Sequence, residues 1–532
     1  MPLIRRKKAS ENDNDQASIS SDDNSKKKKS VSTKKVKTGE KSNKWSCVDS
    51  CCWFVGCICT VWWSLLFLYN AMPASFPQYV TEAITGPLPD PPGVELLKEG
   101  LRAKHPVVFV PGIVTAGLEL WEGHQCAEGL FRKRLWGGTF GEVYKRPLCW
   151  MEHMSLDNET GLDPPAEAKD IAVARSIAPG VLDKDLFGLQ TLQHAMKMTR
   201  TWDSTMSMIP KGGETIWGGL DWSPEEGYVP SQRKQRNSDN SGSNQNGTES
   251  MNCQSKAVKY GRIISFGKDV AEAHSSEISK IDFRGAVKGN NVANTTCRDV
   301  WTEYHDMGIA GIKAVAEYKA YTAGDIVDLL HFVGPKMMAR GSAHFSYGIS
   351  EDLDDPKYRH YKYWSNPLET KLPNAPDMEI FSMYGVGIPT ERAYVYRLSP
   401  SAECYIPFQI DTSANGGDED SCLKDGVFSV DGDETVPVLS AGFMCAKGWR
   451  GKTRFNPSGI QTYVREYDHA PPSNLLLEGR GTQSGAHVDI MGNFALIEDI
   501  IRVAAGATGE DLGGDQVYTD IFKWSEKINL SL

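Results

Sequence analysis

An uncharged apolar run near the N-terminus divides this chain into two parts that meet different surroundings. No charged residue occurs from Ser50 to Thr81, and the segment CCWFVGCICTVWWSLLFLYNA is almost wholly apolar. About 20 apolar residues can cross the hydrocarbon core of a bilayer as a helix, and Trp and Tyr suit its boundaries. We therefore predict a transmembrane helix over residues 50–72. A cleaved signal peptide is the alternative, but the run is long for one and follows a polar arm.

The arm, residues 1–49, is rich in lysine and serine and poor in large apolar side chains. Its first 44 residues hold 13 Lys and Arg against 6 Asp and Glu. Such a composition predicts a disordered arm, with an arm lying on an anionic membrane face as the alternative. The positive-inside rule places it in the cytosol and the body across the membrane. Because the whole chain carries −10, the rest carries −17, and no basic aromatic stripe is present. Nucleic acid is therefore excluded as a partner.

Two features of the body agree with a lumenal location. All four N-x-[ST] sequons follow the apolar run, at Asn158, Asn246, Asn294 and Asn529. Seven of the 12 cysteines also follow it, where an oxidising lumen would let them pair, with an odd one left over. The other five lie in or beside the run, where packing is the plain interpretation and acylation of Cys47, Cys51 or Cys52 the alternative.

The body begins after a Pro-rich connector, residues 73–104, and extends over residues 105–532. The stretch HPVVFVPG predicts a buried strand over residues 107–110 that runs into Pro111-Gly112. Such a strand is typical of the start of an α/β sheet, where the next loop supplies a backbone N–H for an oxyanion. Residues 231–256 form a low-complexity polar insertion.

Further elements follow from local patterns. We expect strands at RIISF and SGIQTYVREYD, and strand, turn, strand over residues 378–398. Helices are expected over residues 303–338, with a break near Gly324, and over residues 492–506. Between Gly112 and Asp377 only RIISF reads as a strand. The central strands of a parallel sheet are therefore missing from the sequence.

An acid and a histidine stand in the order that nucleophilic hydrolases use. Asp433 lies in a turn, VDGDETVP, and His487 lies in a Gly-rich loop before the last long helix. Taken alone, a calcium loop, a surface turn and an ordinary loop histidine are the plain interpretations. In an α/β-hydrolase, however, the triad is ordered Ser, Asp, His. Asp433 and His487 fit the second and third places, and Asp431 stays open as an alternative acid.

Longer motifs carry a specific resemblance. The stretches FVPGIVTAGLELWEG, CAEGLFRKRLWGGTF, KRPLCW, YGVGIPTERAYVY, DGDETVP and SGAHVDIMGNFALIEDI resemble the plant phospholipid:diacylglycerol acyltransferases, relatives of lecithin–cholesterol acyltransferase. The resemblance implies an α/β-hydrolase fold with lid and cap insertions, in the membrane of the endoplasmic reticulum. It implies acyl transfer from a phospholipid to diacylglycerol, giving triacylglycerol without acyl-CoA, metal or other cofactor.

The resemblance also assigns residues. Asp433 becomes the acid and His487 the base, and the backbone N–H of Ile113 becomes half of the oxyanion hole. A lid over residues 117–150 would be stapled by a Cys126–Cys149 disulfide, with Trp136 at its apolar tip. An apolar lid keeps water from an acyl-enzyme, which favours transfer over hydrolysis.

The nucleophile is missing. No serine has glycine at both −2 and +2; Ser346 in HFSYG is the nearest miss, and Ser440 in VLSAG follows the acid, in the wrong order. In the resembled family a long stretch with the central strands and the serine elbow follows SLDNETGLDP. Here that motif passes directly into AEAKDIAVARSIAPG, so we predict an internal excision at about residues 163–166. An omitted exon or faulty gene model is the favoured origin, and a genuinely remodelled site the alternative.

These observations predict an acyltransferase by family whose own chain is inactive. Without central strands, which are buried on both faces, remaining strands such as residues 107–110 should expose edges and apolar faces. We expect incomplete folding, or two poorly joined halves. The competing hypotheses are a non-catalytic lumenal membrane protein that binds lipid or the full-length enzyme, and a product without a stable fold.

Overall fold

The computed structural model describes residues 60–62, 64, 90–110, 118–121, 125–127, 129–136, 146–156, 203–225, 260–273, 278, 302–398, 408–416, 422–472 and 481–532. The chain divides into two units, Met1–Leu88 and Pro89–Leu532. Within the first unit, the few described residues, 60–62 and 64, are helical. The arm and most of the expected span lie outside the described residues. No helix among those described has both the length and the apolar character needed to cross a bilayer.

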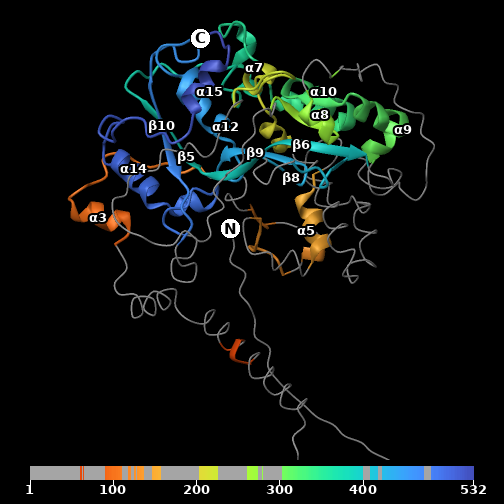
Figure 1. Cartoon of the computed structure of the whole chain (residues 1–532). Helices are drawn as coiled ribbons and strands as arrows, with labels where there is room; N and C mark the ends of the chain where they lie inside the picture. Colours follow the sequence, from red (N-terminus) through yellow and green to blue (C-terminus); the bar gives the residue numbers. More distant parts are fainter. Residues whose placement is uncertain are drawn as a thin grey trace, which may run out of the picture. The chain divides into compact units, whose positions relative to one another are not determined.

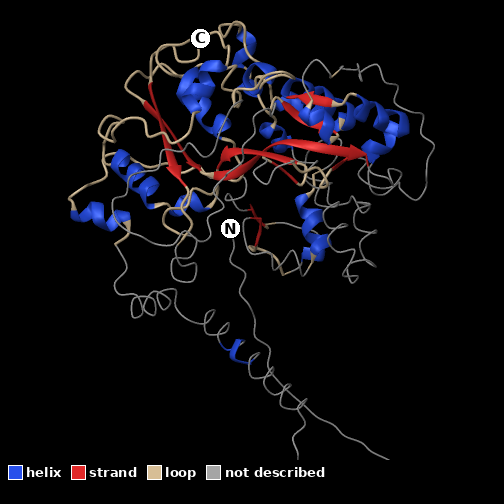
Figure 2. Cartoon of the chain, viewed as in Figure 1, coloured by secondary structure: helices blue, strands red, loops and turns tan. Residues whose placement is uncertain are grey.

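The second unit contains mixed sheets and helices (Figure 2). Its strands are β1 (Leu118–Glu119), β2 (Arg134–Trp136), β3 (Arg262–Phe266), β4 (Ala320–Thr322), β5 (Glu379–Val386), β6 (Ile388–Leu398), β7 (Phe408–Ile410), β8 (Leu423–Lys424), β9 (Val427–Gly432) and β10 (Gln461–Asp468). Its α-helices are α3 (Pro92–Lys98), α5 (Pro147–Met154), α7 (Gly213–Trp217), α8 (Lys268–Glu272), α9 (Thr302–Glu317), α10 (Ala323–Val333), α11 (Pro335–His344), α12 (Val438–Phe443), α14 (Phe494–Ala504) and α15 (Ile521–Lys527). Short helical turns are η1 (Gln125–Ala127), η2 (Asp203–Met208), η6 (Pro356–Arg359), η7 (Tyr361–Tyr363), η8 (Met444–Gly448) and η9 (Asp489–Gly492).

The larger sheet has the order β4-β3-β6-β9-β8, with β7 also paired to β6. Its long central strands, β6 and β9, run antiparallel (Figure 1), whereas β3 lies parallel to β6. The predicted strand RIISF is confirmed as β3. This sheet carries β9 to the turn that holds Asp433.

A second, two-stranded sheet pairs β5 with β10 in parallel, in register from Glu379 with Gln461 to Val386 with Asp468. The predictions of strands at 378–398 and at SGIQTYVREYD are confirmed. The turn between β5 and β6 is Gly387, whose φ of 104° suits glycine. The two strands nevertheless belong to different sheets, because the chain changes direction there instead of closing a hairpin.

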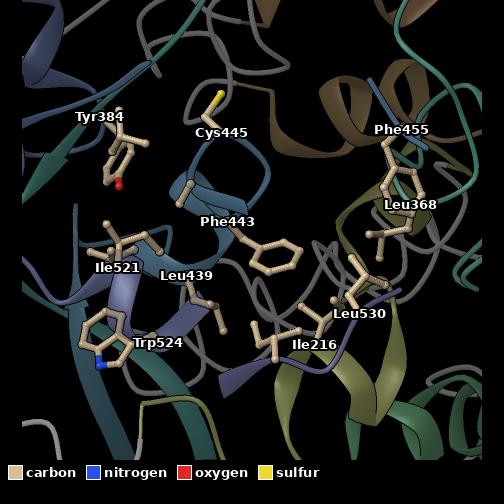
Figure 3. Packing of buried hydrophobic residues seen from close by; sticks show 14 of the residues in the cluster. Ile216, Leu368, Tyr384, Leu439, Phe443, Cys445, Phe455, Ile521, Trp524 and Leu530 are labelled. Carbon is tan, nitrogen blue, oxygen red and sulfur yellow. The ribbon is translucent and has the colours of Figure 1, made fainter. Parts of the chain in front are cut away.

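An apolar core lies where β5 meets α12 and α15 (Figure 3). Its buried members include Tyr384, Leu439, Phe443, Ile521 and Trp524. Burying one large apolar side chain contributes about 2 kcal/mol relative to leaving it exposed. This core therefore anchors the C-terminal end of the chain against the strand that precedes the β6–β9 pair.

The helix predictions hold with one change. The segment 303–338 forms α9, α10 and α11, but α9 ends at Glu317 and strand β4 intervenes. The predicted break near Gly324 is confirmed: the helical run is interrupted before Ala323, where Thr322 caps α10 reciprocally with Asp325 and Gly324 lies in its first turn. The predicted C-terminal helix is confirmed as α14, which Asn493 caps by accepting the Leu496 N–H.

The prediction of a buried strand over residues 107–110 is wrong. These residues form no strand, and Val107, Val108, Phe109 and Val110 are 68%, 84%, 68% and 84% exposed. The chain is attached just before them, where the N–H groups of Lys104 and His105 donate to Ala504 O. The described residues offer no neighbouring strand to this segment. Its apolar side chains therefore face solvent.

Candidate active site

The turn after β9 fixes the carboxylate of Asp433. Its Oδ1 accepts hydrogen bonds from Thr435 N at 3.0 Å and Val436 N at 2.7 Å. Aspartate commonly closes its own turn in this way. The side chain is 11% exposed, and its second oxygen, Oδ2, is left to face the loop before α14. The backbone thus presents one carboxylate oxygen in a defined direction.

His487 meets that oxygen. Its Nδ1 lies 2.8 Å from Asp433 Oδ2, and its backbone N–H donates to Asp433 O at 2.8 Å. With the carboxylate at Nδ1, the geometry assigns the proton to Nδ1 and leaves a lone pair on Nε2. The side chain is 45% exposed. The two residues thus form an acid–imidazole dyad with one ring nitrogen available for chemistry.

Two glycines allow the loop of His487 to pass close to β5. A Cβ at Gly385 would lie 1.7 Å from Gly485 O, so the strand and the loop approach with only hydrogen atoms between them. A Cβ at Gly485 would lie 2.8 Å from Tyr467 O on β10. Small residues in YGVG and SGAH therefore bring the imidazole within reach of the acid turn.

The alternative acid, Asp431, is not the partner of His487. Its buried carboxylate accepts the Gly387 N–H at 2.7 Å and so supports the turn between β5 and β6. The two acids of DGDET therefore do different work, although they are only two residues apart. Residues two apart on a strand would share a face, but β9 ends at Gly432, so the turn redirects Asp433 to a different neighbour.

The dyad opens into a cleft of about 700 Å³. Its described lining consists of Glu391, Tyr394, Glu434, Thr435, Ala486, His487, Val488 and Asp489. Tyr394 donates to Glu391 Oε2 at 2.9 Å, and burial, followed by this hydrogen bond, raises the pKa of its phenol. No serine or cysteine belongs to this described lining. Ser346 follows α11 and Ser440 lies exposed on α12, so neither stands beside the imidazole.

The comparison with protein families decides the relationship. The family model of lecithin:cholesterol acyltransferase matches residues 171–493, more than half of the chain. The chain belongs to the lecithin:cholesterol acyltransferase family. That family has an α/β-hydrolase-like fold, which agrees with the mixed sheets and helices found here. Its close relatives are O-acyltransferases by name.

Three curated relatives of this lecithin:cholesterol acyltransferase family member are phospholipid:diacylglycerol acyltransferases. Enzyme 1 of Arabidopsis thaliana is 59% identical over 630 aligned positions, covering 92% of this chain and 93% of that protein. The Schizosaccharomyces pombe enzyme is 27% identical, covering 82% and 78%. The Saccharomyces cerevisiae enzyme is 27% identical over 577 positions, covering 81% and 75%. No solved structure gives a significant match.

The lid region of this family member contains a disulfide between Cys126 and Cys149, with their Cα atoms 5.8 Å apart. Strands β1 and β2 pair antiparallel beside it. Trp136 ends β2 and stacks on Trp150 of α5, with ring centroids 6.4 Å apart. Trp150 also donates to Leu135 O at 2.7 Å. The disulfide and the stacked rings tie α5 to the small sheet.

Other predicted positions are less informative. Ile113, Asn158, Asn246, Asn294, the junction and the polar insertion lie outside the described residues. Asn529 is exposed after α15. Among the described residues, the group with metal-ligand spacing is Cys126, Cys149 and His153, but its two sulfurs are bonded to each other.

The remaining described cysteines differ in state. Cys422 is disulfide-bonded. Cys445 is free and buried, and burial raises the pKa of its thiol to about 12, which leaves it unreactive.

Sequence reasoning missed the part that β6 plays. Glu391 and Tyr394 line the cleft, and the buried Thr390 contacts the acid turn. All three lie in YGVGIPTERAYVY, where the sequence predicts a strand and carries a family motif but assigns no role in the site. Alternation places Glu391 on the side opposite Thr390, and that signal could have indicated two functional faces.

Proposed function

We propose that this chain derives from an enzyme that moves an acyl chain from a phospholipid to diacylglycerol, giving triacylglycerol, and that the chain itself lacks the serine nucleophile and does not turn over. One observation carries the proposal. The Asp433–His487 dyad faces a cleft whose described lining offers no serine or cysteine. The names of the curated relatives support the substrate classes.

The chemistry explains why the dyad alone does not suffice. In acyl transfer, an imidazole takes the proton of a serine hydroxyl, the hydroxyl oxygen attacks the ester carbonyl, and the leaving alcohol receives the proton. The carboxylate holds the tautomer and stabilises the imidazolium. Here Nε2 of His487 is available, but no described hydroxyl stands on a sharp strand-to-helix bend before it. Among the described residues, the cycle therefore has a base and its carboxylate partner but no acceptor for the acyl group.

Two facts support an internal excision. The alignments with the Arabidopsis and Saccharomyces enzymes are 630 and 577 positions long, more than the 532 residues of this chain. The relatives must therefore contain residues that have no counterpart here. The family match starts at residue 171, shortly after the expected junction at residues 163–166. An excision there would remove the central strands together with the elbow.

We propose further that the chain is a single-pass protein of the endoplasmic reticulum membrane, with residues 1–49 cytosolic and residues 105–532 lumenal. The uncharged run, the basic arm before it and the position of all four sequons after it support this topology. Protease protection of the body in sealed microsomes, with digestion of the arm, is the expected result. An endoglycosidase-insensitive body that is digested in intact microsomes would contradict it.

Turnover is tested in cells that lack other triacylglycerol-forming acyltransferases. Expression of this chain should yield no labelled triacylglycerol from labelled phospholipid, whereas the intact Arabidopsis relative should yield it. A fluorophosphonate probe should label the relative and leave this chain unlabelled. Labelled triacylglycerol that disappears in Ser346→Ala would show that Ser346 is the nucleophile, and the proposal would fall.

A second function is favoured by the exposed segment at residues 107–110. Four consecutive apolar residues with free edges suit pairing with a strand of another chain. The chain would then bind the full-length enzyme without catalysis. Tagged chain should co-purify with the full-length relative from detergent extracts, and Val108→Lys should abolish this. Retention of binding in Val108→Lys, or no binding by the original chain, would contradict it.

A further inference from the structure

A buried threonine of β6 holds the acid turn from outside. The hydroxyl of Thr390 donates to Ile388 O at 3.0 Å and accepts the N–H of Glu434 at 2.9 Å. The residue is 0% exposed. The hydroxyl thus donates its hydrogen within β6 and accepts a hydrogen bond from Glu434, the residue that follows Asp433.

The bond to Glu434 stabilises an unfavourable backbone conformation. Glu434 has a φ of 83°, in the left-handed region that residues with a Cβ seldom adopt. This conformation turns the N–H groups of Thr435 and Val436 back toward Asp433 Oδ1. The N–H of Glu434 itself points the other way, toward β6, where Thr390 accepts it. Without that acceptor, no described hydrogen bond from a neighbouring strand holds the strained residue.

Close packing at Gly432 is independent evidence for the same contact. A Cβ at this position would lie 2.4 Å from Thr390 Oγ1 and 2.4 Å from Val436 O. The hydroxyl therefore packs directly on the backbone of the turn. Both the polar contact at Glu434 and the steric contact at Gly432 locate Thr390 against the residue that presents the carboxylate.

We propose that Thr390 is a positioning residue for the dyad: its hydroxyl keeps the acid turn in the conformation in which Asp433 Oδ2 reaches His487 Nδ1. Thr390 touches neither the imidazole nor the cleft, so it acts only through Asp433. A role for Thr390 in catalysis rests on the proposed function of the dyad. Its role in holding the acid turn does not depend on whether this chain turns over.

The test observes the hydrogen bond itself. The full chain in detergent micelles, labelled with ¹⁵N only in histidine rings, should show a low-field Nδ1–H proton of His487, assigned by its loss in Asp433→Asn. In Thr390→Val the opening equilibrium constant of this hydrogen bond should rise about fivefold, the ratio that one ordinary hydrogen bond supplies, so its proton should exchange with solvent faster and its resonance should weaken. Thr390→Ser, which keeps the hydroxyl, should retain it.

A matched control is Thr462→Val. Thr462 is also buried, and its hydroxyl donates to Cys445 O at 3.1 Å, away from the dyad. This control should lose stability without losing the resonance. A resonance of full intensity in Thr390→Val would overturn the proposal, because a merely structural threonine would then explain the contacts.

A second variant covers the case in which Thr390→Val does not fold. Glu434→Gly removes the strain of the left-handed backbone. Adding Thr390→Val to this variant should therefore reduce the intensity of the His487 resonance much less than Thr390→Val does in the original chain. An undiminished loss in the double variant would overturn the proposal. Turnover by this chain would overturn the proposed function alone, whereas a resonance that survives Asp433→Asn would show that the dyad is wrongly assigned.

Discussion

Glu466 provides a quantitative test of how the C-terminal part of the body is held. It lies on β10 and is 0% exposed. Its Oε2 accepts the N–H groups of Tyr518 at 2.6 Å and Thr519 at 2.8 Å. Its Oε1 accepts the hydroxyls of Tyr384 at 2.9 Å and Thr519 at 2.6 Å. One carboxylate therefore joins β5, β10 and the segment before α15.

Two substitutions separate hydrogen bonding from charge. Glu466→Leu leaves two buried N–H groups without acceptors, at about 1–3 kcal/mol each, so we expect it to cost about 4 kcal/mol. Glu466→Gln can keep both N–H groups on its oxygen and donate its NH₂ to the two hydroxyl oxygens. We therefore expect Gln to cost less than about 1 kcal/mol near pH 4.

The sign of the pH dependence follows from the pKa of Glu466. Burial raises this pKa, and the four hydrogen bonds oppose that rise without cancelling it. The folded state thus holds its proton more tightly than the unfolded state. The stability that this gives is complete below the unfolded pKa and is lost as pH rises through the folded pKa. Glutamine does not titrate. The free energy of unfolding of Glu466→Gln should therefore rise relative to that of the original chain as pH increases.

Hydrogen exchange measured by mass spectrometry on the full chain reports the local opening free energy of β10 from pH 4 to 8. Rates are corrected for intrinsic exchange at each pH. A Gln variant that weakens relative to the original chain with rising pH would refute the argument, because the hydrogen bonds would then outweigh burial. A loss below about 1 kcal/mol in Glu466→Leu would refute the count of unsatisfied donors.

Three further perturbations have defined outcomes. Arg392→Met breaks an ion pair with Glu225 in which both side chains are 2% exposed, and should cost about 4 kcal/mol in denaturant unfolding. Adding Glu225→Leu should recover most of it, since no buried charge is then left alone. Replacing Cys126 and Cys149 together by serine should destabilise the lid region by about 3 kcal/mol, seen as faster proteolysis between β1 and α5; unchanged cleavage would contradict this. Gly385→Ala forces a Cβ into a carbonyl of the loop before α14, so the low-field histidine proton should disappear while the core cluster persists; a retained signal would contradict the close approach.

Short-range patterns predicted much of the molecule. Strands β3, β5, β6 and β10 and helix α14 follow from alternation, helical spacing and caps, which act between residues close in sequence. The order of Asp433 and His487 indicated an acid and a base, and each lies in the turn or loop that its glycines predicted. The absence of a serine with glycine at both −2 and +2 was also evident from sequence, because an elbow requires glycines at fixed positions.

Partners distant in sequence were beyond such patterns. The apolar run at residues 107–110 predicts a strand, but a strand forms only beside another, and the described residues supply none to it. The choice between Asp431 and Asp433 depended on which neighbour each carboxylate meets. The hydrogen bond from the Glu434 N–H to the Thr390 hydroxyl joins residues 44 positions apart, and nothing in either local sequence indicates it.

The amino-acid order alone determined which chemical groups this chain possesses, and that no serine has glycine at both −2 and +2, because folding cannot change the residues beside a serine. Only the tertiary structure decided that a carboxylate and an imidazole 54 residues apart meet at 2.8 Å. That meeting depends on two glycines letting a loop touch a strand and on a hydroxyl of β6 holding a strained turn. Such contacts are made by packing in three dimensions, where separation along the chain has no bearing on which atoms are neighbours.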